Sequence, residues 1–256
     1  MNGKRVNAMK TQIVLVCPAA RCGEAAQTGL PVLRLGLGLD CRGTLIRTMA
    51  QTRRPGDFLG LSDFGVTEPV PAAVVRQLLD EAQGAGGIVA DFERDHPALH
   101  AFLQHLDAAC TEAGLPLFVP ACRIDCAPNA WAIAPGAASG GCLRDELERG
   151  MRARHGRLAV AFEPTRRRFL LPADDPDGES LTESELTALR QRTGAHAFFS
   201  RELCANYFTY MDGAQGVFVL FDNPDTLRAR LELIQNAGVP YVFAVWEGCE
   251  ALFNRP

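Results

Sequence analysis

The 256-residue sequence predicts an α/β fold: a (β/α)8 TIM barrel with a small antiparallel β insert between its seventh and eighth strands. Three observations lead to this prediction. Eight short apolar runs recur along the chain, amphipathic segments of helical length separate most of them, and a stretch at about 195–222 interrupts the alternation. Runs that are continuously apolar are typical of parallel strands covered on both faces. Because barrels of about 250 residues form one unit, we expect a single domain over residues 1–256.

The strands are expected where the apolar runs lie, at residues 12–17, 32–38, 57–61, 87–92, 116–120, 130–134, 157–162 and 240–246. Prolines at 71, 97 and 224 begin helical segments, Gly114 and Gly238 end two of them, and Thr182 with Glu185 predicts a capping box. Within the insert, the turn Asp212–Gly213 between apolar runs is typical of a β-hairpin. The basic run 166–168 is expected to be a solvated loop. An open dinucleotide-binding sheet is disfavoured, because GLGLD at 36–40 lacks the third glycine of that fingerprint.

Charge and composition exclude several classes of partner. The sequence has 26 Lys+Arg against 30 Asp+Glu, a net charge of −4, which argues against a nucleic-acid surface. No apolar run reaches the ~18–20 residues of a membrane span, and the run 13–16 is too short for a signal peptide. The nine cysteines include no CxxC pair, so we expect reduced thiols and no zinc site.

The segment GGIVADFE, residues 86–93, carries the chemistry. Asp91 and Glu93 end an apolar strand, and strand alternation points both toward the barrel mouth, where such barrels have their active sites. Two neighbouring carboxylates raise one pKa, which keeps Glu93 protonated as a general acid with Asp91 as its partner. The alternative is that these residues simply end a strand at the surface.

GGIVADFE resembles the fourth-strand signature, Asp-Gly-x-Asp-x-Asp-x-Glu, of the glycoside hydrolase family 18 barrels, which include the chitinases. Residues 207–248 resemble the closing segment of that family, in which an antiparallel insert leads to a helix and an eighth strand ending in Trp. LPLFVP resembles the fifth strand and RLAVAFEPTRRRFLLP the seventh, so the resemblance covers roughly residues 57–253. It is strongest to the branch found in spore-germination and cortex-lytic proteins.

The resemblance implies roles for individual residues. Glu93 matches the general acid/base, and the 2-acetamido oxygen of the sugar acts as nucleophile in this family. Asp91 matches the residue that orients the acetamido group, Trp246 the aromatic floor under the sugar, and Tyr207 a wall of the groove. The alternative for Trp246 is a core position at the end of the last strand.

Two departures from the family weaken this match. Val89 stands at the first acidic position of the signature, and the sixth strand, residues 130–135, has neither the Tyr nor the Asp typical of the family. On that strand, Trp131 is either a second sugar platform or a core residue. Ser62, Asp63 and Asp125 are candidates for ligand contact, with loop capping as the alternative. His96 and His100 have the spacing of a helical metal pair, but their helix is expected outside the barrel, so we expect no metal and no cofactor.

Two hypotheses therefore remain. The first is a glycosidase acting on N-acetylglucosamine-containing glycans, either peptidoglycan or chitin-like. The second is a catalytically silent barrel that binds such glycans or serves as a structural or coat-associated protein. Either implies an oligosaccharide ligand, no nucleic acid and no membrane, in a cytoplasmic or spore-associated protein, and nothing in the sequence indicates the oligomeric state.

Overall fold

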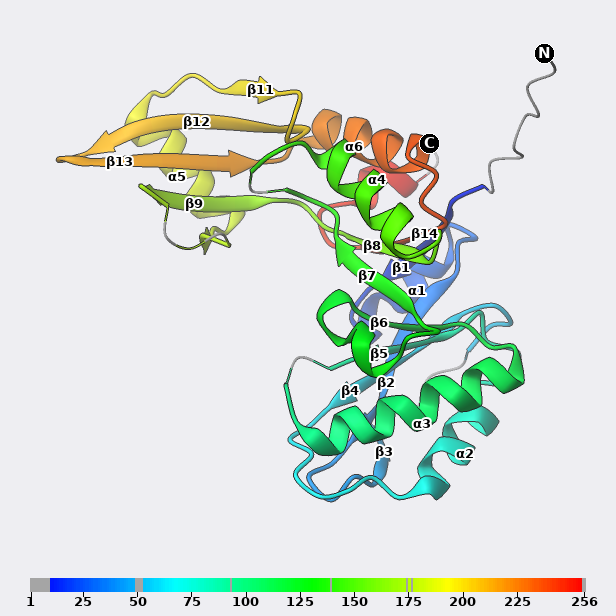
Figure 1. The fold of residues 1–256 in the computed structure, drawn as a ribbon. Helices are drawn as coiled ribbons and strands as arrows, with labels where there is room; N and C mark the ends of the chain where they lie inside the picture. The colour runs from blue at the N-terminus through cyan, green and yellow to red at the C-terminus, as the bar shows by residue number, and fades with distance from the viewer. Residues whose placement is uncertain are drawn as a thin grey trace, which may run out of the picture.

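A computed structural model describes residues 10–48, 53–92, 94–138, 140–173, 175 and 177–254 of the chain. Its largest part is a closed barrel of eight parallel strands, as the sequence predicted (Figure 1). Each strand pairs with the next, and β1 pairs with both β14 and β2, which closes the sheet. The barrel strands are β1 (Gln12–Val16), β2 (Val32–Leu39), β4 (Phe58–Asp63), β5 (Ile88–Asp91), β6 (Leu117–Pro120), β7 (Trp131–Pro135), β8 (Leu158–Phe162) and β14 (Tyr241–Val245).

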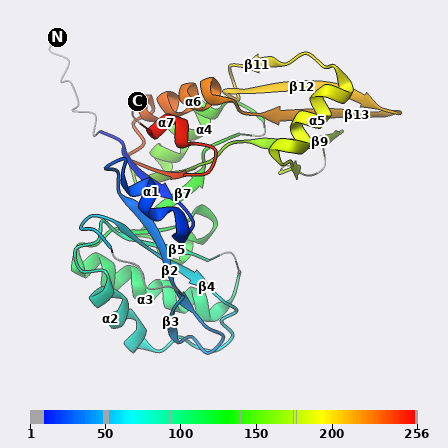
Figure 2. The ribbon, with the colours of Figure 1, turned by 180° about the vertical axis from the view of Figure 1, so that it is seen from behind.

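Helices pack around the outside of the barrel, and two of the connections between its strands show no α-helix in the described residues (Figures 1 and 2). After β2 the described chain forms β3 (Leu45–Arg47), which pairs antiparallel with β2, and after β6 it forms the 3-10 helix η2 (Ala121–Cys126). The remaining connections carry η1 (Ala19–Arg21), α1 (Cys22–Ala26), α2 (Ala72–Glu81), α3 (Pro97–Ala113), α4 (Leu143–Ala153) and α6 (Pro224–Asn236), and α7 (Glu250–Phe253) follows the last strand.

The helix signals in the sequence are confirmed at the atomic level. Pro97 and Pro224 lie in the first turns of α3 and α6, where the missing N–H costs nothing. Gly114 ends α3 in the left-handed conformation, at φ 65°, which favours glycine. Among the helices described, none is long and apolar enough to cross a membrane.

The antiparallel insert lies between β8 and β14, as predicted, and it is larger than the stretch 195–222 (Figure 1). Its sheet has the order β10-β9-β13-β12-β11. The prediction of a solvated loop at 166–168 is wrong: these arginines begin β9, and Arg166 and Arg168 form ion pairs with Glu183 and Glu179 of the same insert. The elements of the insert are β9 (Arg166–Leu171), β10 (Glu179–Ser180), α5 (Glu183–Thr193), β11 (Phe198–Ser200), β12 (Ala205–Asp212) and β13 (Gln215–Phe221).

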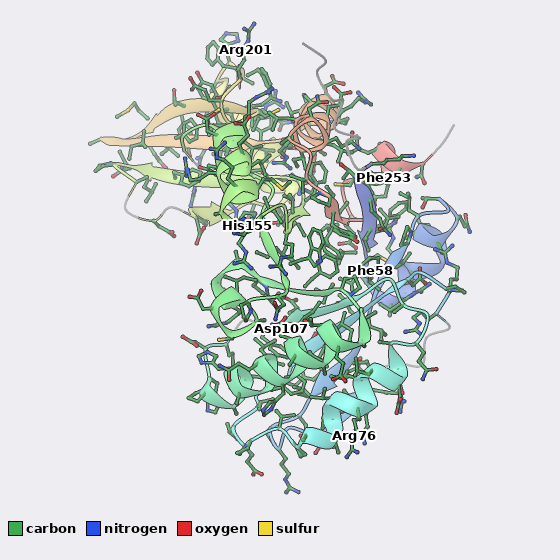
Figure 3. The ribbon with its side chains drawn as sticks, turned by 45° about the vertical axis from the view of Figure 1, so that its right-hand side comes forward. Phe58, Arg76, Asp107, His155, Arg201 and Phe253 are labelled. Atoms are coloured by element: carbon green, nitrogen blue, oxygen red, sulfur yellow. The ribbon has the colours of Figure 1, made fainter. Side chains whose placement is uncertain are left out.

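The interior of the barrel is filled by side chains. One buried residue from each of seven strands joins a single cluster, and the eighth strand, β7, adds Trp131 and Ile133. Phe58 lies near the middle of the molecule, and its ring packs edge-on against Phe118 and Phe243 at centroid distances of 5.7 Å (Figure 3). Phe58 and Phe118 come from the first half of their strands, so their rings fill the amino-terminal end of the barrel. The carboxyl ends of the strands form the opposite end, called the barrel mouth below.

Candidate active site at the barrel mouth

The inner face of β5 carries the first candidate residue. Val89 is 4% exposed and belongs to the interior cluster, whereas Ile88 and Ala90 pack outward against the helices. Because side chains alternate along a strand, Asp91 lies on the same inner face as Val89, one step closer to the mouth. Asp91 is exposed, so its carboxyl group is in contact with solvent at the barrel mouth.

Glu93, predicted as the general acid, lies outside the residues that the structure describes. Its pairing with Asp91 therefore stays a prediction. Phe92, between the two, is fully buried and its ring packs 6.1 Å from that of Phe102 on α3.

Ser62 is brought next to Asp91. The two residues are register partners on the adjacent parallel strands β4 and β5, about 4.8 Å apart in the hydrogen-bonding direction. Asp63, the following residue, has a different use. Its carboxylate accepts the amide N–H groups of Gly65 and Val66 and pairs with Arg94 at 2.8 Å, which is the loop-capping role left open as an alternative.

Two further features of the mouth were not predicted from the sequence. Arg123 of η2 is nearly buried, pairs with Asp95 at 2.9 Å, and brings a guanidinium toward the carbonyl of Phe92 at the end of β5. On β8, three strands further around the barrel, Ala161 on the inner face is exposed and Glu163 follows it at the surface. The mouth is therefore polar and charged above an apolar floor.

Trp246 is placed away from this inner face. It follows Val242 and Ala244 in the outer cluster between the barrel and its helices and is 0% exposed. Its indole N–H is buried without a hydrogen-bond partner among the described residues, with the Arg21 guanidinium 6.0 Å from the ring centroid. Arg21, which donates to both carboxylate oxygens of Glu24, lowers the pKa of that carboxyl. This is the core position that the sequence left as an alternative, and the ring would have to move to receive a sugar.

Trp131 and Tyr207 both pack against other aromatic rings. Trp131 begins β7 at the amino-terminal end of the barrel, stacked at 6.0 Å on Phe118, where it packs in the interior. Burial raises the pKa of its neighbour Tyr241. Tyr207 lies on the face of the insert sheet opposite α5, between Phe198 and Phe218. Its assignment as a groove wall stays a prediction.

The histidines beside β5 have structural partners. The His96 ring nitrogen accepts the amide N–H of Ala98 and so caps α3, and His100 pairs with Asp95. Asp125 of η2 is exposed. Across the described residues, no group of three His, Cys, Asp or Glu side chains is arranged to hold a metal ion.

No protein-family model and no curated protein matches this sequence. Solved structures do match the fold. The spore cortex-lytic enzyme SleL of Bacillus megaterium QM B1551 aligns over 93% of this chain and 71% of its own, with a TM-score of 0.55 and 16% identity. A chitinase from Chromobacterium violaceum ATCC 12472 aligns over 95% and 97%, with a TM-score of 0.58 and 17% identity. A class V chitinase from Nicotiana tobaccum, solved as a mutant in complex with NAG4, aligns over 92% and 93%, with a TM-score of 0.56 and 12% identity.

These similarities establish the fold. The chain has the TIM-barrel fold of the glycoside hydrolase family 18 chitinases and of the spore cortex-lytic enzymes. In this chain a small antiparallel sheet precedes the last barrel strand. At this level of identity they do not extend to substrate or mechanism, which rest on the residues at the mouth.

Proposed function

We propose that this barrel hydrolyses glycans that contain N-acetylglucosamine, with Glu93 as general acid/base and Asp91 as its partner. The observation that carries the proposal is the position of Asp91. It is an exposed carboxyl residue on the inner face of β5, directly above the buried Val89 and beside Ser62. The carboxyl end of a barrel strand is where enzymes with this fold have their catalytic groups.

The proposed reaction needs no nucleophile from the protein. Glu93 donates a proton to the glycosidic oxygen as the bond to the anomeric carbon breaks, and the acetamido oxygen of the same sugar attacks that carbon. Asp91 accepts a hydrogen bond from the acetamido N–H and stabilises the positive charge that develops there. Water then opens the cyclic intermediate, and Glu93 takes the proton back from that water.

A second function, glycan binding without hydrolysis, is favoured by two inner-face positions. The position directly below Asp91 is occupied by the buried methyl groups of Val89. A carboxyl or amide side chain at that position would hydrogen-bond to Asp91, and valine does not. On β7, Ile133 packs against the same interior cluster and offers no donor to an acetamido group. A barrel with these residues still has a polar mouth for binding a sugar.

The experiment that tests the proposal is hydrolysis of aryl N-acetyl-chitooligosaccharides and of cortex muropeptides. Cortex glycan belongs in the test because a spore cortex-lytic enzyme has a similar fold. Glu93→Gln keeps the size of the side chain and removes its acid, so kcat is expected to fall by about 10²–10⁴-fold. Asp91→Asn is expected to lower kcat as well.

Glu112→Gln is the matched control, because Glu112 is exposed on α3 outside the barrel. It is expected to hydrolyse at the wild-type rate. Binding of N-acetylchitotetraose by calorimetry separates the two functions. Binding without turnover by the wild type would leave the silent barrel, and absence of both would reject each function.

A further inference from the structure

Phe64 is an exposed aromatic side chain at the barrel mouth. Among the described residues, the other large apolar side chains with high exposure lie on the insert: Leu170, Leu171, Phe198, Phe199 and Met211. Phe64 is 49% exposed and follows β4 directly, two residues beyond Ser62. Because single exposed apolar side chains are common on protein surfaces, the contacts of the Phe64 ring, and not its exposure alone, indicate its use.

Gly38 shows which way the Phe64 ring points. Leu37 and Leu39 of β2 pack outward against the helices, so the side-chain position of Gly38 faces the inside of the barrel. A Cβ on Gly38 would overlap the ring carbons of Phe64. The ring therefore lies over β2 on the inner side of the sheet, at the mouth.

Glycine is needed at position 38 because the Phe64 ring occupies the space of a side chain, and not because of the backbone conformation. It is not among the residues with positive φ, so its backbone conformation is open to other residues. Glycine within a strand weakens the strand and often marks the close approach of another group. In this strand the approaching group is the Phe64 ring.

The backbone around Phe64 is held on both sides. The Phe64 amide donates to the carbonyl of Leu39 at 2.9 Å, and the Asp63 carboxylate accepts the amides of Gly65 and Val66 at 3.0 and 2.9 Å. Arg94 pairs with Asp63 and donates to the carbonyl of Val66. A side chain on a backbone that is held in advance loses less conformational freedom on binding than one on a mobile loop.

We propose that Phe64 is a stacking platform for a sugar ring of the glycan, adjacent to the sugar bound at Asp91. The apolar C–H face of a pyranose matches an aromatic ring with one open face, and the hydroxyl edges remain beside the polar groups of the mouth. This inference rests on the proposed function, because it assigns Phe64 to the same glycan-binding mouth.

The test compares Phe64→Ala with Phe199→Ala, which removes a phenylalanine of equal exposure, 49%, from strand β11 of the insert. Binding of N-acetylchitotetraose is measured by calorimetry. Phe64→Ala is expected to weaken binding about three- to tenfold, the usual size of an aromatic contact, whereas Phe199→Ala is expected to bind like the wild type. Gly38→Ala keeps the Phe64 side chain but pushes its ring aside, so this variant is also expected to bind the oligosaccharide more weakly. Phe64→Tyr keeps an aromatic ring and is expected to bind like the wild type.

The outcomes separate this inference from the proposed function. If the wild type binds or hydrolyses the oligosaccharide and Phe64→Ala behaves like Phe199→Ala, the platform is refuted and the proposed function stands. If the wild type neither binds nor hydrolyses, the proposed function itself fails, and the platform with it. Thermal denaturation of each variant identifies any loss of binding that comes from unfolding.

Discussion

Single side chains at the ends of the barrel strands determine the chemistry of the mouth. Val89 and Asp91 are two residues apart on one face of β5, yet one is packed in the interior and the other is in solvent. The boundary between apolar floor and polar mouth falls between them. A carboxyl at position 89 would be desolvated by the interior cluster, whereas at position 91 it keeps contact with water.

The buried cysteines give a prediction at the residue scale. Burial, with a hydrogen bond to Cys22 at an Sγ–Sγ distance of 3.3 Å, raises the pKa of Cys17 to about 12. Burial also raises the pKa values of Cys110 and Cys249 to about 12. Since the thiolate is the reactive form, these three thiols are expected to resist iodoacetamide at pH 8 in the folded protein.

Cys41 and Cys122 are exposed and serve as internal controls that are expected to be alkylated first. Mass spectrometry of peptides after timed labelling measures each rate. Equal rates for Cys17 and Cys41 would contradict the burial of Cys17, and labelling in urea should make all sites react.

At the scale of elements, polar contacts hold neighbouring strands in register where the apolar pattern does not. Asp57 precedes β4 and is almost fully buried. Its carboxylate accepts the amide of Val32 at 2.9 Å and the guanidinium of Arg34 at 3.0 Å, both on β2, and the amide of Arg54 at 3.1 Å. Burial alone would raise the pKa of Asp57, but these hydrogen bonds outweigh it and lower the pKa below its ordinary value.

Asp57→Asn is therefore expected to destabilise the protein by about 3 kcal/mol at pH 7, because it leaves Arg34 buried without its counter-charge. The lowered pKa also sets a direction with pH. The contribution of Asp57 is complete above the pKa of the unfolded state, about 3.9, and is lost as the pH falls through the lower pKa of the folded state. Urea unfolding at pH 7 and pH 3 should show that the free energy of unfolding falls less on acidification in Asp57→Asn than in the wild type. Equal decreases in the two proteins would contradict a lowered pKa of Asp57 in the folded state.

At the scale of the whole molecule, a buried charge network joins the insert to the barrel. Arg230 of α6 is 0% exposed and pairs with Asp222, at the end of β13, at 3.0 Å. The same guanidinium donates to the Thr165 hydroxyl, at 2.8 Å, and to the carbonyl of Glu163, where the chain leaves β8. The amide of Thr165 donates to Asp222 at 2.7 Å. The network thus ties the entry and the exit of the insert to one helix of the barrel.

Arg230→Met is expected to lower the free energy of unfolding by about 3–5 kcal/mol, because Asp222 remains buried without its partner. Arg228→Met is the matched control on the same helix. Arg228 pairs with Asp225 at the surface, and both are mostly exposed, so its loss is expected to change stability by about 0.5 kcal/mol or less. Urea denaturation measures both variants, and similar midpoints for the two would show that the network does not hold the insert.

Much of the barrel could be predicted from local sequence. Each of the eight parallel strands lies where a continuous apolar run lies, and α3 and α6 begin at their prolines. β9 could not be predicted, because Arg166 and Arg168 are polar in sequence and become strand residues only through pairing with β13 and with glutamates of the insert. The strand that β9 pairs with along its whole length, β13, lies about fifty residues further along the chain.

For the candidate site too, some features follow from the local sequence and others only from tertiary contacts. The sequence by itself determined that Asp91 ends an apolar strand, and the tertiary structure put it on the inner face beside Ser62. A strand that is apolar on both faces carries no signal for which face turns inward, so only the closed barrel decided that Tyr241 packs inside and Trp246 outside. The contact between Phe64 and Gly38 likewise required β2 and β4 to pair, since residues 26 positions apart meet only when the sheet forms. Helix ends and apolar runs depend on near neighbours in the chain, whereas faces, register and the mouth depend on contacts between distant residues.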